Sequence, residues 1–249
     1  MKNKAIDGLK ASIQEKLAQA RKLQEQNQEI SVLMDEIWEL SKKKFVLSTK
    51  QNKDLKRYKG IIFTVGLTAE PIILNILVNE PEAAYFIHTK NSVEIVNRIV
   101  EETKLVPAQY KRDLIHKDSL ASSYKLIKFG LSTLTSEYGL ETSQSALDPT
   151  GGTKIMSLGC GVAASIFNID LLYVSNNDYD PILRRPVPGS EILMQIPNPL
   201  DVCKRDIDYE KFKDALASKL AKKSASSKKD FYKNQEKDKR EDRSKNLYS

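Results

Sequence analysis

The sequence contains very few of the residues that build disulfides, metal centres or catalytic pairs. Cys160 and Cys203 are the only cysteines among 249 residues, and His88 and His116 are the only histidines. Two isolated cysteines do not make a disulfide framework, and two histidines without a cysteine cluster argue against a zinc site. We therefore expect no metal and no cofactor, and the cysteine usage is typical of a reducing compartment.

Long apolar runs are absent as well. No stretch of 18 apolar residues occurs, and the first ten residues, MKNKAIDGLK, lack the apolar segment of a signal peptide. From these absences we expect a cytoplasmic protein with no membrane partner.

The excess of positive charge is confined to the two ends of the chain. Residues 1–59 hold 14 Lys/Arg against 8 Asp/Glu, and residues 204–249 hold 15 against 9. The middle, residues 60–203, is acidic, with 11 against 16. The basic excess therefore belongs to the flanks and says little about the ligand of the central part.

The first 59 residues have the pattern of two helices. Apolar residues recur every three or four positions before a polar stretch at 24–29, and a second stripe starts at Ile30. The first stripe consists of Ile6, Leu9, Ile13, Leu17, Ala20 and Leu23. The pattern predicts a helical hairpin or coiled coil that packs on itself or on a second subunit. The alternative is an arm that binds a separate effector protein.

From Gly60 onward, strand and helix patterns alternate. Strands are expected at 61–65, 83–87, 111–115, 144–147 and 170–174, and helices at 93–102, 119–136 and 154–167. This order predicts an α/β fold, a Rossmann-like doubly wound and mainly parallel sheet, over residues 60–203. A short amphipathic helix at 204–223 and a disordered basic tail at 224–249 are expected to follow.

Ligands of such sheets bind beyond the carboxyl ends of the strands, where three polar loops are expected to meet. The loops are Thr64–Glu70, Thr89–Ser92 and Pro149–Lys154. In the last loop, two adjacent glycines allow a tight turn and a close approach to a ligand. The hydroxyls of Thr150 and Thr153 and the Lys154 ammonium would then converge on phosphate near a helix N-terminus. A plain strand-to-helix connector is the alternative, and the Walker A spacing is absent.

Residues 159–164 match the dinucleotide fingerprint G-x-G-x-x-A, but in the wrong place. The match lies inside a predicted helix and does not follow the first strand. We interpret its small residues as a surface for close packing on the sheet.

Four segments, in order between Gly60 and Pro199, resemble CARF domains, the CRISPR-associated Rossmann fold. They are FTVGLTAEP, AAYFIHTKNS, DPTGGTKIMSLG and DYDPILRRPVPGSEILMQIPNP, and the turn from Asp148 to Met156 is the most specific element. The resemblance implies a homodimeric sensor of cyclic oligoadenylate, the second messenger of type III CRISPR systems.

The resemblance also implies a set of ligand-binding residues on the three loops and on the segment after the last strand. For the two arginines of this set, the alternative is pairing with Asp178 and Asp180 in a surface hairpin. The implied residues are Thr68, Glu70, Thr89, Lys90, Asn91, Ser92, Thr150, Gly151, Gly152, Thr153, Lys154, Met156, Arg184 and Arg185.

Three functions remain open from the sequence. Family members usually carry an effector domain, but no R-x-x-x-x-H ribonuclease pair occurs here and no catalytic residue is assigned. We expect a non-enzymatic sensor that signals through its helical arm or a partner. The alternatives are a metal-independent ring nuclease acting in the same pocket, and a regulator that contacts nucleic acid weakly through its basic flanks.

Overall fold

The computed structural model describes residues 2–115 and 119–198. The expectations for His116, for Cys203 and for the segments 204–223 and 224–249 lie outside the described residues. The described residues belong to one compact unit. None of their helices is long and apolar enough to cross a lipid bilayer.

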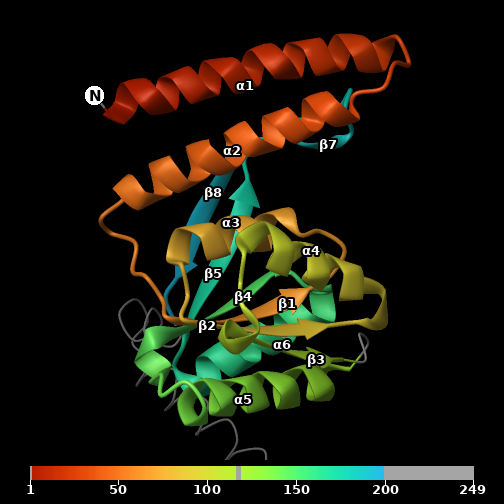
Figure 1. The fold of residues 1–249 in the computed structure, drawn as a ribbon. Helices are drawn as coiled ribbons and strands as arrows, with labels where there is room; N and C mark the ends of the chain where they lie inside the picture. The colour runs from red at the N-terminus through yellow and green to blue at the C-terminus, as the bar shows by residue number, and fades with distance from the viewer. Residues whose placement is uncertain (1, 116–118, 199–249) are drawn as a thin grey trace, which may run out of the picture. The chain divides into compact units, whose positions relative to one another are not determined.

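The N-terminal region consists of two helices, α1 (Lys2–Glu25) and α2 (Ser31–Gln51), which lie side by side (Figure 1). Asn27 turns the chain between them with a φ of 55°. Ile13, Leu17 and Ala20 of the first stripe are buried against Ile37 of α2. The two predicted helices are therefore present, and they form a hairpin.

The second helix also packs on the α/β part of the same chain. Phe45 is buried with Leu74, Val78 and Val174, and Trp38 packs beside them. This helix therefore packs with one side on α1 and with another on the sheet and its helices.

The sheet has six strands in the order β3-β2-β1-β4-β5-β8. The first five are parallel, and β8 runs antiparallel to β5. Together with the helices on both faces, this arrangement confirms the predicted Rossmann-like α/β fold. The strands are β1 (Gly60–Val65), β2 (Ala83–His88), β3 (Tyr110–Leu114), β4 (Ser145–Gly151), β5 (Asp170–Asn176) and β8 (Glu191–Ile196).

Helices cover the two faces of the sheet in pairs. One apolar cluster joins β1 and β2 to α3 (Glu70–Asn79) and α4 (Val93–Thr103). The other joins the opposite side chains of the same strands to α5 (Leu120–Ser136) and α6 (Lys154–Phe167). Because the chain moves to one side of β1 for β2 and β3 and to the other for β4 and β5, the strand order reverses between β1 and β4. Their carboxyl ends are the expected ligand position.

A two-stranded hairpin, β6 (Tyr179–Asp180) and β7 (Arg185–Pro186), follows β5 and was not predicted as strands. Asp180 is buried there and accepts hydrogen bonds from Arg21 Nε at 2.7 Å and from the amides of Ile182 and Leu183 at 3.0 Å. Burial alone would raise the pKa of Asp180, but these donors hold it below its ordinary value. The hairpin is thereby tied to α1.

Candidate ligand-binding site

Where β1 and β4 end, the backbones of the two segments are in contact. A Cβ atom on Gly66 would lie 2.1 Å from the carbonyl oxygen of Gly151, and one on Gly152 would lie 2.3 Å from Thr64 Oγ1. Neither glycine of the turn has a positive φ. The predicted tight turn is present, because the Gly152 amide donates to the Pro149 carbonyl at 3.3 Å. The same glycines also let the ends of β1 and β4 approach each other. Their approach to a ligand stays a prediction.

The last residues of β4, where the turn begins, are fixed by two hydrogen bonds. The buried carboxylate of Asp148 accepts the Thr150 amide at 2.7 Å. The Thr150 hydroxyl accepts the Val174 amide of β5 at 3.0 Å. The hydroxyl of Thr150 is therefore engaged with β5, and its backbone is held by Asp148.

Helix α6 begins directly at this turn. Thr153 is its N-cap and accepts the Met156 amide at 3.3 Å, and Ser157 Oγ donates to the Pro149 carbonyl at 3.0 Å. Lys154 is the first helical residue and is exposed. The site thus combines a helix N-terminus with an exposed ammonium group, both of which favour an anion.

The loop after β2 is tied to the end of β1. Ser92 is fully buried, and its hydroxyl accepts the Thr89 amide at 2.9 Å and donates to the Val65 carbonyl at 3.0 Å. Lys90 and Asn91 are exposed beside it. Ser92 occupies the N-cap position of α4, but its side chain makes no capping hydrogen bond there. A short 3₁₀ turn, Lys90–Ser92, precedes α4 and directs this hydroxyl toward β1.

The loop after β1 presents one exposed hydroxyl and one carboxylate. Thr68 is exposed, whereas Glu70 starts α3 and pairs with Arg98 Nη1 of α4 at 2.8 Å. The structure therefore brings the three predicted loops to one edge of the sheet, with Thr68, Lys90, Asn91 and Lys154 exposed on it.

Three of the implied ligand residues lie elsewhere. Met156 is fully buried in the core below α6, so its side chain does not reach the surface. Arg184 and Arg185 are exposed on the β6–β7 hairpin, which Figure 1 shows beside the start of α2 and away from the end of β1. The alternative interpretation placed these two arginines in a surface hairpin, which is correct. It also paired them with Asp180, which is wrong, because Asp180 pairs with Arg21.

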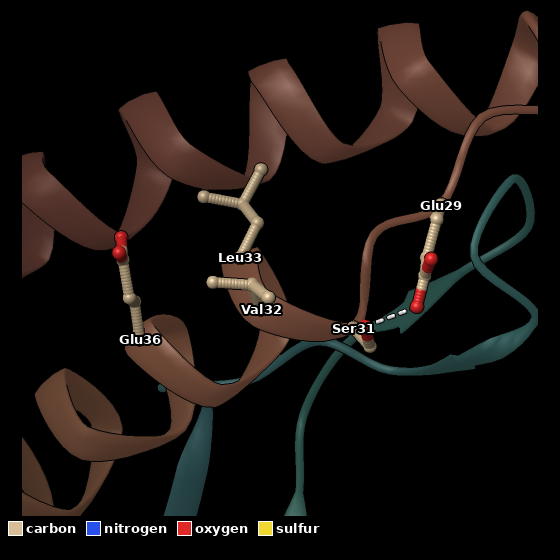
Figure 2. A pocket seen from close by; sticks show the side chains of 5 residues that line it. All are labelled: Glu29, Ser31, Val32, Leu33 and Glu36. Carbon is tan, nitrogen blue, oxygen red and sulfur yellow. Dashed lines mark hydrogen bonds between the residues drawn. The ribbon is translucent and has the colours of Figure 1, made fainter.

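A hollow of about 310 Å³ lies near this hairpin, at the start of α2 (Figure 2). Its polar groups are engaged with one another or with α1: Ser31 Oγ donates to Glu29 at 2.7 Å, and Glu36 pairs with Lys16 at 2.5 Å. In the part of the chain that the structure describes, no group of three His, Cys, Asp or Glu could hold a metal ion. This hollow therefore lacks the free polar groups of a second ligand-binding site.

The G-x-G-x-x-A segment packs closely, as predicted, and it does so on two partners. Cys160, Ala163 and Ala164 are buried in the cluster shared with the sheet, and a Cβ on Gly159 would lie 2.3 Å from Ser123 Oγ of α5. Cys160, next to it, is buried, and burial and the nearby Asp148 raise the pKa of its thiol.

Comparison with known proteins gives a sequence relative and an overlap with a solved structure. Over 145 residues, 55% of the chain, the sequence is 35% identical to the CRISPR system endoribonuclease Csm6 of Thermus thermophilus. The resemblance to CARF-domain proteins is thereby confirmed. The chain spans 29% of the length of that relative. No family model matches the chain.

Among solved structures, the chain overlaps with Can2 from Sulfobacillus thermosulfidooxidans in complex with cyclic tetra-adenylate. The TM-score is 0.39 and the identity 20%, over 47% of this chain and 32% of that one.

Sequence analysis missed two residues that support the candidate site. Asn75 lies in α3 and donates a hydrogen bond to Asp148, and Arg98 lies in α4 and pairs with Glu70. The sequence did contain an indication of Asn75, because this polar residue interrupts the otherwise apolar helix EPIILNILVN. The sequence contained no indication of Arg98, because a charged residue on an amphipathic helix is ordinary.

Proposed function

We propose that the protein binds cyclic oligoadenylate of a type III CRISPR response at the carboxyl edge of its sheet. The similarity to Csm6 over 145 residues supports this ligand, and the observation that carries the proposal is the exposed Lys154 at the N-terminus of α6. Turn amides, a helix N-terminus and an ammonium group together favour phosphate without any catalytic group.

Lys154→Ala should weaken the binding of cyclic tetra-adenylate or cyclic hexa-adenylate by about 1.5–3 kcal/mol, because a charge-assisted hydrogen bond is lost. Isothermal titration calorimetry measures the change, and circular dichroism should show unchanged secondary structure. Lys128→Ala on α5 removes another exposed lysine and serves as the control. Equal affinity of Lys154→Ala and the parent protein would refute the assignment of the turn.

We further propose that two copies of the chain share one ligand. A ring of adenylates has internal rotational symmetry and suits a two-fold axis. Beside the turn, α6 exposes an apolar stripe at helical spacing, with Leu158 54% and Ile166 60% exposed. The stripe consists of Ile155, Leu158, Val162 and Ile166. A second copy placed against this stripe brings the two turns together.

Leu158→Glu should therefore convert a dimer to a monomer, because a charge would be buried in an apolar interface. Light scattering at micromolar concentration measures the mass. Val106→Glu, at a site that is 53% exposed outside α6, should leave the dimer intact. A parent protein that is monomeric with and without ligand would contradict the shared site.

A line of polar contacts connects the ligand edge to the helical arm. Glu70 at the first loop pairs with Arg98, and Arg98 Nε pairs with Glu102 at 2.8 Å. Glu102 in turn accepts Trp38 Nε1 at 2.9 Å and Lys42 Nζ at 3.2 Å from α2. Burial alone would raise the pKa of Glu102, but these donors hold it below its ordinary value. An anion that attracts Arg98 would loosen this contact, and we propose that binding is signalled to the arm in this way.

The sole tryptophan, Trp38, reports on this contact. Ligand binding should change its fluorescence in the parent protein. Arg98→Gln should bind more weakly, because the anion loses its attraction to Arg98, and should show no such change at saturating ligand. Arg112→Gln, which removes an exposed arginine from β3, is the control. If Arg98→Gln kept the full fluorescence response, signalling through this contact would be ruled out.

The other two functions stay predictions. Ring nuclease activity would appear as linear adenylates when the same ligand–protein samples are analysed by chromatography. Nucleic-acid binding by the flanks would appear as an affinity that falls steeply with salt.

A further inference from the structure

A buried line of hydrogen bonds runs from Tyr58, just before β1, through two side chains of α3 to Asp148 of β4. The Tyr58 amide donates to Asn79 Oδ1 at 3.3 Å, and Asn79 Nδ2 donates to Asn75 Oδ1 at 2.5 Å. Asn75 Nδ2 then donates to Asp148 Oδ2. Asn75 and Asp148 have no exposed surface, and Asn79 is 8% exposed.

The direction of every hydrogen bond in this line is fixed by its two ends. The line starts at the Tyr58 N–H, which can only donate, so each asparagine accepts on one side and donates on the other. It ends at the Thr150 N–H, which also only donates, to Asp148 Oδ1. Asp148 is therefore required to accept on both oxygens, which a carboxylate without its proton does best.

We propose that Asn75 and Asn79 are positioning residues of the ligand-binding turn, which orient Asp148 as a two-sided acceptor and so fix the Thr150 backbone. The inference rests on the proposed function for the identity of the ligand, but the positioning itself is a property of the free protein. The proposal predicts that the order of the Thr150 backbone depends on the pattern of donors and acceptors at residue 148. It does not depend on which residue of the line carries the negative charge.

The surroundings of Asp148 give this line a pH dependence. Burial raises the pKa of Asp148 to about 6, even though the Thr150 hydroxyl, the Thr150 amide and Asn75 lower it by hydrogen bonding. The groups around it are all uncharged: Asn75 on α3, the Thr150 hydroxyl, the Cys160 thiol on α6, and Thr64 on β1, which donates to the Asp148 backbone carbonyl. Below pH 6 one oxygen of the protonated carboxyl carries an O–H that donates, so that oxygen accepts less well from Asn75 Nδ2 or from the Thr150 amide. The protection of the Thr150 amide against hydrogen exchange should therefore be lower at pH 5 than at pH 7.

The decisive experiment exchanges the two ends of the Asn75–Asp148 hydrogen bond. Asp148→Asn presents an extra N–H that faces either the Thr150 amide or Asn75 Nδ2, both donors. Asn75→Asp places a second carboxylate against Asp148. In the double variant Asn75→Asp/Asp148→Asn, the new amide at position 148 again accepts the Thr150 N–H through its oxygen. Its nitrogen donates to the new carboxylate at position 75, which also accepts from Asn79. Every hydrogen bond is restored with the same total charge.

We expect each single variant to lose the protection of the Thr150 amide and to bind cyclic tetra-adenylate at least about tenfold more weakly. The double variant should recover protection and bind within about threefold of the parent. Asp35→Asn, at an exposed position of α2, is the matched control and should behave as the parent.

A folded double variant that keeps the low protection and low affinity of the single variants would overturn the proposal, and so would a double variant that does not fold. If the parent protein bound neither cyclic tetra-adenylate nor cyclic hexa-adenylate, the proposed function would fail. Hydrogen exchange of the free protein would still decide the role of the asparagines.

Discussion

Gly66→Ala should abolish ligand binding and lower the stability of the fold. The added methyl group would lie 2.1 Å from the Gly151 carbonyl oxygen, and both atoms belong to backbone that cannot rotate away. Relief requires β1 and the turn after β4 to separate, which moves Thr150 and the start of α6. We expect a loss of about 3 kcal/mol in the free energy of unfolding, the upper part of the range for overpacking, and an affinity loss of more than about 100-fold.

Chemical denaturation and calorimetry measure these two effects. Gly161→Ala is the control, because a Cβ atom at Gly161 has no neighbour within 4 Å. In the middle of α6 this substitution should stabilise the fold by roughly 0.5–1 kcal/mol. A Gly66→Ala variant with the stability and affinity of the parent would show that the two backbones do not need to touch.

Phe45→Ala should lower the free energy of unfolding by about 3–5 kcal/mol, because it leaves a cavity where α2 packs on the sheet domain. Phe45 is 1% exposed and contacts Leu74, Val78 and Val174. Loss of this contact should also loosen α1, whose buried stripe packs on α2. Hydrogen exchange should therefore rise in both helices of the arm, more than in β1 and β4.

Val32→Ala on the same helix provides the comparison. Val32 is 72% exposed, and its removal should change the stability by less than about 0.5 kcal/mol. If both variants were equally stable, the arm would not be anchored on the sheet through Phe45.

The parallel sheet was predictable because its strands are continuous apolar runs. All six residues of β1 and all six of β2 are buried, as a strand covered on both faces requires. The edge strand β8 escaped prediction because only one of its faces packs on the core, and Met194 on the other face is 43% exposed. The β6 and β7 strands have two residues each, too few for any period to be visible.

The composition of the site was easier to predict than its geometry. The residue types of the turn indicated an anion, and Lys154 is exposed as expected. The contact between Gly66 and Gly151 joins residues far apart in the chain, so no local pattern indicates it. The same holds for Arg98 and Glu70, and for Arg21 and Asp180, whose pairing depends on how the helices pack.

The contact between β1 and β4 has a consequence for how ligand preference could evolve. Where these strands end, the floor of the edge is main chain, and main-chain atoms offer the same chemistry whatever the sequence. A floor of this kind recognises phosphate but does not distinguish one ring from another. Under the proposed function, the charge of Lys154 serves every ring alike, and discrimination would come from the other exposed side chains of the edge, Thr68, Lys90 and Asn91. Selection can vary these three positions, since none of them is part of the buried core that holds the floor in place.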